Sequence, residues 1–429
     1  MTEGVPESPR AVLHRAVETN SRRNDENLGP LSARHGFVPA RPPLTSLPAS
    51  HAGWDDIAAE LPALHAHLTL RGRLTELPLL DSAALPQRFL QRAATILGIL
   101  VHAHRRVEPR REGATPTPAA LAVPWRQVCA RLGRDRPALS YLDLIVANWQ
   151  LPEGRTDARL PAVRLLVPTV GTPEEQYFYL TQLDLLARAS PLVAAAARAA
   201  EAVEHDAADT LATELQAMAA CVDELTRTGL PRIDPRPGRP YHVDPVVWAK
   251  TVAPLAVPLT PGTPGPSGTA SPMFALLDAV TGRRAYRSVI GDEARGLLRA
   301  HPPHWREFLT AVASAGIDTY PARHPPLDRA RAELRAVHAG HGGLLWRHRL
   351  KAMGYLDTAF RVGRDVTISG FPAPTKVGAE LAAARAERPG AEPDGRLRDL
   401  RAPGTPIAPS QLLAHHRAAD RHWIALAGT

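Results

Sequence analysis

The sequence contains one histidine whose surroundings suit a metal ligand on a helix. His348 lies within residues 344–356, where apolar residues recur at helical spacing. The residues four and seven positions later, Ala352 and Tyr355, share its helix face. A small residue one turn from a ligand lets a flat macrocycle approach the helix, and a single helical imidazole is one way in which proteins bind haem iron. The spacing therefore indicates an iron ligand as one interpretation of His348.

The same pattern also fits a structural histidine. On periodicity alone, a buried or partly exposed structural residue is the more frequent case for a histidine on an apolar face. His341 lies seven residues before His348 and is a second candidate ligand. Gly340, Gly342 and Gly343 surround it, however, and make that turn a poor rigid platform. The pattern alone leaves the role of His348 open.

Helical spacing dominates the elements that must position these side chains. Few runs alternate with a period of two, and no internal repeat is present. The sequence therefore predicts a mainly α fold. The expected helices are 54–68, 85–104, two pieces within 124–149 broken at 133–137, 174–200, 207–228, 273–280, 304–315, 327–338, 344–362 and about 376–387.

Composition excludes several classes of protein. The formal charge is +8, but the basic residues are spread along the chain without interleaved aromatic residues, which argues against nucleic-acid binding. Two distant cysteines, Cys129 and Cys221, give neither a disulfide framework nor zinc spacing. No apolar stretch approaches the ~20 residues of a membrane span, and no secretory signal is visible. We therefore expect a cytoplasmic protein without membrane partners.

Five segments, taken in order, resemble the indoleamine 2,3-dioxygenase family of haem enzymes, which open the indole ring of tryptophan. The most specific is AVPW (122–125) leading to SYLDLIVANW (140–149). The others are GFVP (36–39) with 47–48 and the helix from Trp54, QYFYLT (176–181), GPSGTAS (265–271) with Phe274 and Asp278, and the His348 helix with Tyr355. The similarity covers most of residues 30–390, and it implies haem b as cofactor and dioxygen as co-substrate.

The resemblance also implies a domain organisation. Outside the resemblance, residues 1–28 are polar and charged and are expected to be a disordered arm, and residues 401–429 are expected to be a C-terminal tail. Residues 29–168 correspond to a small, mostly helical N-terminal domain whose helices cap the distal pocket. Residues 169–400 correspond to the large helical domain that binds haem.

Particular site residues follow from the resemblance. His348 is similar to the proximal haem ligand, Thr181 stands at a distal serine near bound dioxygen and is the expected catalytic residue, and Ser267 matches a serine that bonds a haem propionate. The remaining expected contacts are Tyr355 to the cofactor and, to the substrate, Tyr141, Leu144, Ile145, Tyr177, Trp248, Lys250 and Gly268. Alternatively, Tyr141 and Tyr177 are ordinary core aromatics, and Thr181 bonds back to its own helix.

Two positions depart from the family pattern. The arginine that grips the substrate carboxylate falls on Ala253. A lost charge-assisted bond is worth roughly 1.5–3 kcal/mol, and Lys250, Arg239 and His242 are the candidate replacements. The family arginine three residues before the proximal histidine, which lies near the propionates and the position of Asp278, is Leu345; Arg347 and Arg349 are its nearest substitutes.

A second relative in this superfamily is the pyrrolnitrin-pathway enzyme that rearranges chlorinated tryptophan. Its segment after the proximal helix resembles ISGFPAP (368–374), and a following run resembles GAEL (378–381). Residues 363–374 are therefore either a plain surface loop or a lid over the distal pocket.

Three functions remain for this chain. The first is a haem b oxygenase that uses dioxygen on tryptophan or an indole-containing derivative, in specialised metabolism. The second is a non-ring-opening oxidation or rearrangement of an aromatic amino-acid derivative at the same haem. The third is a non-catalytic haem-binding or sensor protein. The expected partners are a small aromatic substrate and an electron donor that keeps iron ferrous; the oligomeric state is open.

Overall fold

Helices build almost the whole chain, as expected for a mainly α fold. The computed structural model describes residues 7–23, 26–106, 116–154, 160–259, 265–283, 298–321 and 323–361. Its only sheet within these ranges is a short hairpin of β1 (Trp149–Gln150) and β2 (Arg164–Leu165), with Trp149 opposite Leu165. None of the helices in the described ranges is long and apolar enough to cross a membrane.

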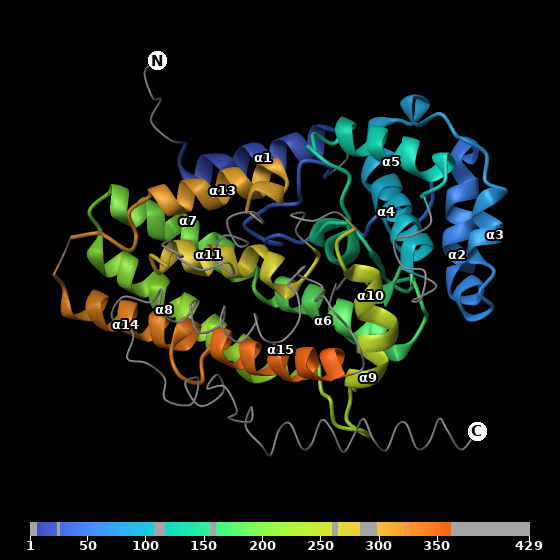
Figure 1. Ribbon diagram of the computed structural model, residues 1–429. Helices are drawn as coiled ribbons and strands as arrows, with labels where there is room; N and C mark the ends of the chain where they lie inside the picture. The colour runs from blue at the N-terminus through green and yellow to red at the C-terminus, as the bar shows by residue number, and fades with distance from the viewer. Residues whose placement is uncertain are drawn as a thin grey trace.

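A group of four helices lies at one end of the molecule (Figure 1). They are α2 (Ala52–Ala66), α3 (Leu70–Thr75), α4 (Leu90–Arg106) and α5 (Ala119–Arg131). Nearly every residue of α4 is buried, which is the pattern of a central helix with apolar neighbours on all sides. The other three helices pack around it, α2 and α3 on one side and α5 on another.

The remaining helices form the larger part of the molecule (Figure 1). In it α8 packs between α7 and α14, α14 contacts α15, and α11 packs on α13. Their bounds are α6 Pro173–Arg188, α7 Ser190–Glu204, α8 Ala208–Glu224, α9 Pro245–Val247, α10 Ala253–Ala256, α11 Pro272–Val280, α13 Pro303–Ser314, α14 Pro325–Ala339 and α15 Leu344–Arg361. One continuous apolar core joins both parts, because α10 contacts α4 and His102 Nδ1 lies 2.9 Å from the carbonyl oxygen of Leu255. The predicted boundary at residue 168 remains a prediction.

The predicted helix over 174–200 is in fact two helices. Helix α6 begins with Thr172, whose hydroxyl accepts a hydrogen bond from the backbone N–H of Glu175, and with Pro173 in the first turn. It ends at Arg188, and α7 starts at Ser190. Pro191 explains the break, because a proline ring clashes with the carbonyl four residues earlier and lacks the N–H of a continuing helix.

The expectation of a disordered arm is wrong for residues 9–23. These residues form α1 (Pro9–Arg23), whose buried Val12, Leu13 and Ala16 pack on α7 and α13. Ion pairs add to the contact, including Arg15 with Glu307 at 2.9 Å. The composition of this segment is polar because only one narrow face of α1 is apolar. The helix is therefore stabilised by its tertiary packing, which the composition does not show.

The described residues contain three five-residue π-helical segments. They are η5 (Leu142–Val146), η6 (Leu225–Gly229) and η8 (Trp248–Val252). Such wide turns occur often at functional sites, since they redirect side chains that a regular helix would place elsewhere. Two of them, η5 and η8, coincide with segments expected to line the substrate pocket. The expected helix at 376–387, the lid at 363–374 and the tail at 401–429 lie outside the described residues.

Candidate active site

His348 projects from α15 toward the loop that precedes α11. A Cβ atom built on Gly268 would lie 2.9 Å from His348 Nε2, and the ring of Phe274 packs on the imidazole at 5.1 Å between centroids. Burial lowers the pKa of His348 to about 4, with the charges of Arg349 and Lys351 acting in the same direction. The imidazole is therefore neutral at physiological pH, which is the form that binds a metal ion.

The loop of Gly268 is held from two sides. On one side the hydroxyl of Tyr141 hydrogen-bonds the side chain of Ser271, and on the other His301 Nε2 donates to the carbonyl oxygen of Ala270 at 2.9 Å. Ser267 and Ser271 are both buried. The loop therefore joins the region expected to cap the site to the His348 helix.

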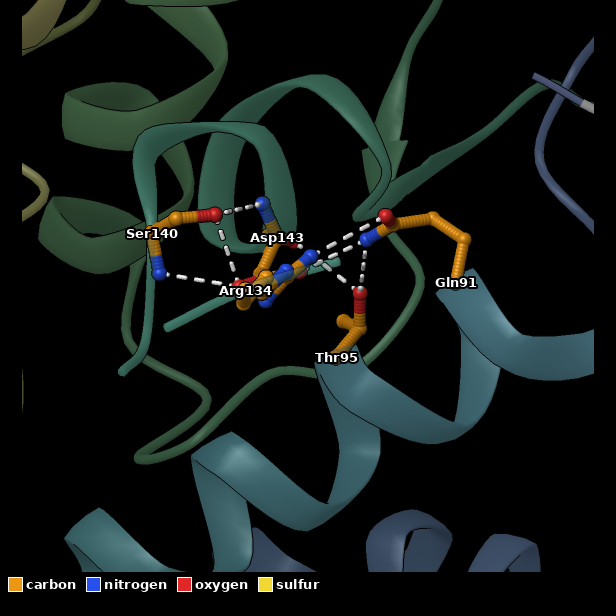
Figure 2. A network of polar contacts seen from close by, with 5 residues as sticks. All are labelled: Gln91, Thr95, Arg134, Ser140 and Asp143. Carbon is orange, nitrogen blue, oxygen red and sulfur yellow. Dashed lines mark hydrogen bonds and ion pairs between the residues drawn. The ribbon is translucent and has the colours of Figure 1, made fainter. Parts of the chain in front are cut away.

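Tyr141 is positioned by a buried ionic network around Asp143 (Figure 2). The Asp143 carboxylate accepts hydrogen bonds from both terminal nitrogens of Arg134 at 2.7 Å, from Gln91 at 2.6 Å, and from the N–H and hydroxyl of Ser140. Thr95 lies beside it, its hydroxyl 3.4 Å from the Asp143 carbonyl oxygen. Burial raises the pKa of Asp143, but Arg134 and Ser140 outweigh burial and hold that pKa below its ordinary value. The network fixes the start of η5 and hence the residues on either side of it.

The expected pocket residues of η5 and α6 are buried. Leu144 and Ile145 are each 1% exposed, and Thr181 is fully buried. Within the described part of the chain, Thr181 Oγ1 has no hydrogen-bond partner. The alternative in which Thr181 bonds back to its own helix is therefore not observed, and its hydroxyl is available to a ligand.

Sequence reasoning missed Gln182, the next residue on α6. It is 7% exposed, and its Nε2 donates to the Phe178 carbonyl oxygen at 3.4 Å. Its Oε1 lies 3.9 Å from the Cβ position of Gly268 and has no hydrogen-bond partner among the described residues. The signal in the sequence was an amide inside the apolar run from Leu180 to Leu183, which looked like an ordinary polar position.

The aromatic residues divide into two groups. Tyr177 packs edge-on against Tyr241 at 5.5 Å, and the guanidinium of Arg232 lies over the Tyr241 ring. In the second group Trp248 lies 5.3 Å from Phe178 and 5.3 Å from Tyr355. The structure thus places Tyr177 beside the turn at 241 and brings Phe178, which sequence reasoning did not single out, against Trp248.

Tyr355 and Lys351 fasten the His348 helix to residues 233–243. The Tyr355 hydroxyl donates to the carbonyl oxygen of Val243 at 2.7 Å, and the Lys351 ammonium donates to the carbonyl oxygen of Ile233. Burial lowers the pKa of Lys351 to about 8. Both contacts are with backbone, so they orient α15 and with it the imidazole of His348.

At the first departure from the family pattern, the structure shows how far Ala253 and its three proposed replacements are buried. Ala253 is buried, but Lys250 is exposed, and Arg239 is exposed as well. His242 is half-buried, and its Nε2 has no hydrogen-bond partner in the described ranges. Of the three proposed replacements for the carboxylate arginine, only His242 therefore has a buried polar atom without a partner.

At the second departure, the structure shows other partners for Asp278. Leu345 is buried, and Arg347 donates through Nε to the carbonyl oxygen of Gly342. Asp278 instead pairs with Arg283, whose Nη1 lies 3.0 Å from each carboxylate oxygen, and with Nε2 of the buried His338 at 2.8 Å. Sequence reasoning missed both partners because Arg283 and His338 lie on different elements.

These residues fit haem in their chemistry. A neutral imidazole is the form that could hold iron, Phe274 packs on it, and the residue in front of Nε2 is a glycine, so only backbone faces this nitrogen. Gly268 now lies so close to Nε2 that a ligand on this nitrogen requires the loop to move away from α15. The two unpartnered groups, Thr181 Oγ1 and Gln182 Oε1, give the surroundings the few polar atoms that a mainly apolar ligand pocket contains.

Comparisons with known proteins agree with this arrangement. A family profile described as indoleamine 2,3-dioxygenase matches residues 30–242. The chain is 30% identical over 183 residues to indoleamine 2,3-dioxygenase 1 of Rattus norvegicus, a match that covers 42% of this chain and 45% of the rat protein. It is 29% identical over 202 residues to an indoleamine 2,3-dioxygenase of Penicillium citrinum, covering 46% of this chain and 44% of the relative. An indoleamine 2,3-dioxygenase of Aspergillus candidus is 27% identical over 207 residues, 46% of this chain and 50% of that protein.

The matched region contains the Asp143 network, Tyr141, Thr181 and Gln182, and it spans about half the length of the curated relatives. His348 and the Gly268 loop lie beyond residue 242, and the structure connects them to the matched region through Tyr141 and Ser271. From the family match and the mainly α fold, the chain belongs to the indoleamine 2,3-dioxygenase-like superfamily.

Proposed function

We propose that this chain is a haem b-dependent oxygenase that uses dioxygen on a small indole-containing substrate. The observation that carries the proposal is the His348 imidazole, which faces Gly268 and which burial keeps neutral. His348 would be the proximal ligand, and Phe274 would fix the imidazole plane. Ser267, on the same loop as Gly268, would hydrogen-bond a propionate.

Haem, when bound, supplies the dioxygen-binding metal and the electrons for activating oxygen. The protein's own residues then bind and orient the substrate. Leu144 and Ile145 would form an apolar wall that excludes water, and Tyr141 would hold the Gly268 loop through Ser271. The Thr181 hydroxyl would supply a hydrogen-bond donor for dioxygen in the site. Because an indole ring is electron-rich, no strong general base is required.

Asp278 would orient Arg283, with which it pairs, and His338 packs against the same carboxylate. An external electron donor would keep the iron ferrous.

The substrate is proposed to be tryptophan or an indole derivative of specialised metabolism. Ala253 removes the charge that would grip a free carboxylate, and Lys250 is exposed one turn away. A derivative whose carboxyl group is absent or modified fits this site better than tryptophan itself. The same departure favours a second candidate, which is a non-ring-opening oxidation or rearrangement at the same haem.

Two experiments test these proposals. The purified protein, reconstituted with haem, is expected to show a haem absorption band that His348→Ala abolishes and that His341→Ala retains; His341 is exposed and stacks on Trp346, so it is a matched control. A His348→Ala protein with a full haem band refutes the ligand assignment. Turnover of tryptophan and of tryptamine under ¹⁸O₂ then separates the reactions, since a product with both labelled atoms indicates dioxygenation. Haem binding without any turnover would identify a binding or sensor protein.

A further inference from the structure

Gln182 has a buried side-chain amide whose N–H group is hydrogen-bonded within the described residues, whereas its oxygen is not. The Nε2 group donates to the Phe178 carbonyl oxygen within α6, and Oε1 has no hydrogen-bond partner among the residues that the structure describes. The side chain is 7% exposed. A buried acceptor without a donor is unfavourable, and such groups are rare in folded proteins unless a ligand or water completes them.

The direction of Oε1 follows from the contacts of the amide. If the amide were turned around, Oε1 would face the Phe178 carbonyl oxygen, and two acceptors would repel each other. The oxygen therefore points away from the helix. It lies 3.9 Å from the Cβ position of Gly268, which is 2.9 Å from His348 Nε2. Oε1 thus lies beside the contact between Gly268 and His348.

Water could donate to Oε1, but among haem, dioxygen and substrate only the substrate carries a donor. Haem presents carboxylates and hydrocarbon edges, and dioxygen is an acceptor, so neither can donate to Oε1. The Thr181 hydroxyl can both donate and accept, but an amide oxygen only accepts. An indole-containing substrate is the occupant that carries N–H groups, one on the ring and, in an amine or amino acid, another on the side chain.

We propose that Gln182 Oε1 accepts a hydrogen bond from an N–H group of the substrate and thereby determines specificity. The inference rests on the proposed function, because it takes the substrate to be an indole derivative. It assigns to Gln182 a contact with a substrate nitrogen, which is separate from the carboxylate contact missing at Ala253. A site with a buried acceptor rejects an analogue that lacks the donor, since binding the analogue leaves the acceptor unpaired.

The test compares Gln182→Leu with the wild-type protein on three probes. These are tryptophan, 1-methyltryptophan, in which the ring N–H is capped, and indole-3-propionate, in which the amine is absent. Dissociation constants come from titrating the haem absorption band. The wild-type protein is expected to bind tryptophan about tenfold or more tightly than one of the two analogues, and the analogue concerned identifies which N–H is bound. In Gln182→Leu that preference falls to within about twofold.

Controls separate this role from a structural one. Gln216→Leu places the same change at an exposed position of α8 and is expected to keep the wild-type preference. If Gln182→Leu does not fold, Gln182→Met removes the acceptor while keeping a flexible side chain. Both variants also lose the Nε2 hydrogen bond to the Phe178 carbonyl oxygen, so their melting temperatures show only that each variant folds.

Two further outcomes remain distinguishable. A wild-type protein without a haem band refutes the proposed function, and the melting-temperature shifts of the haem-free chain with the same three probes then test Gln182. If the wild-type protein and Gln182→Leu discriminate equally between the probes in either assay, the inference about Gln182 is wrong.

Discussion

Removing the charge of Asp143 is expected to destabilise the fold far more than the same change on the surface. The carboxylate is fully buried, and its oxygens lie 2.7 Å from both terminal nitrogens of Arg134. At an effective dielectric constant of about 20, charges about 3 Å apart attract by roughly 5–6 kcal/mol. Desolvation of both groups offsets most of this attraction, but removing one partner leaves the other buried and uncompensated. We therefore expect Asp143→Asn to lower the free energy of unfolding by about 3–5 kcal/mol.

The matched control is Asp223→Asn. Asp223 pairs with Arg227 at 2.8 Å, four residues later in the chain, and both side chains are largely exposed. The expected loss in the free energy of unfolding is therefore below about 1 kcal/mol. Urea unfolding at neutral pH measures both. Adding Arg134→Met to Asp143→Asn is expected to recover part of the loss, since the lone guanidinium is gone. Equal losses in the two single variants would refute the reasoning.

Three further predictions concern the site. Gly268→Ala places a methyl group 2.9 Å from His348 Nε2, so we expect a loss of about 1–3 kcal/mol in thermal unfolding and weaker haem retention; an unchanged haem affinity would contradict the assigned proximity. Lys250→Ala is expected to leave the Kd for tryptophan within about twofold, because Lys250 is exposed, and a tenfold loss would restore it as the carboxylate partner. Burial lowers the pKa of His348 and His301 to about 4 and that of His102 to about 3. The unfolded chain therefore binds protons that the folded chain does not, so stability should fall as the pH decreases from about 6.5 to about 3. A urea midpoint that stays flat over this interval would disprove it.

The sequence predicted the class of fold and most helix positions because periodicity records which face is buried. It failed where tertiary packing decides the outcome. Helix α1 has a narrow apolar face, and it is stabilised because this face packs on α7 and α13. Pro191 divides one long stretch of helical periodicity into α6 and α7. The π-helical turn of η5 has no sequence signal of its own, since the network around Asp143 joins residues from three separate segments.

From the sequence, a residue of the candidate site could be proposed only where its type suggests one chemical role, as a histidine suggests a metal ligand. A histidine on an apolar helix can be proposed as a ligand from its position, but whether anything faces Nε2 depends on a loop 80 residues away. The same limitation explains the two missed partners of Asp278: Arg283 follows it on the chain, but His338 comes from α14. Lys250 was placed near the substrate by helical spacing, whereas the π-helical turn at η8 leaves it exposed and buries Trp248.

The family match and the proposed iron ligand lie in different parts of the chain, and the structure supplies the connection between them. The matched residues end at 242, yet Tyr141 within them hydrogen-bonds Ser271 of the loop that contains Gly268, and Gly268 lies against His348. Changing Tyr141 to phenylalanine removes this hydrogen bond without altering any iron ligand. If the loop transmits the position of η5 to the imidazole, Tyr141→Phe should weaken haem retention by about tenfold or less while His348 still binds iron. Retention identical to the wild-type protein would show that the two halves of the site are organised independently.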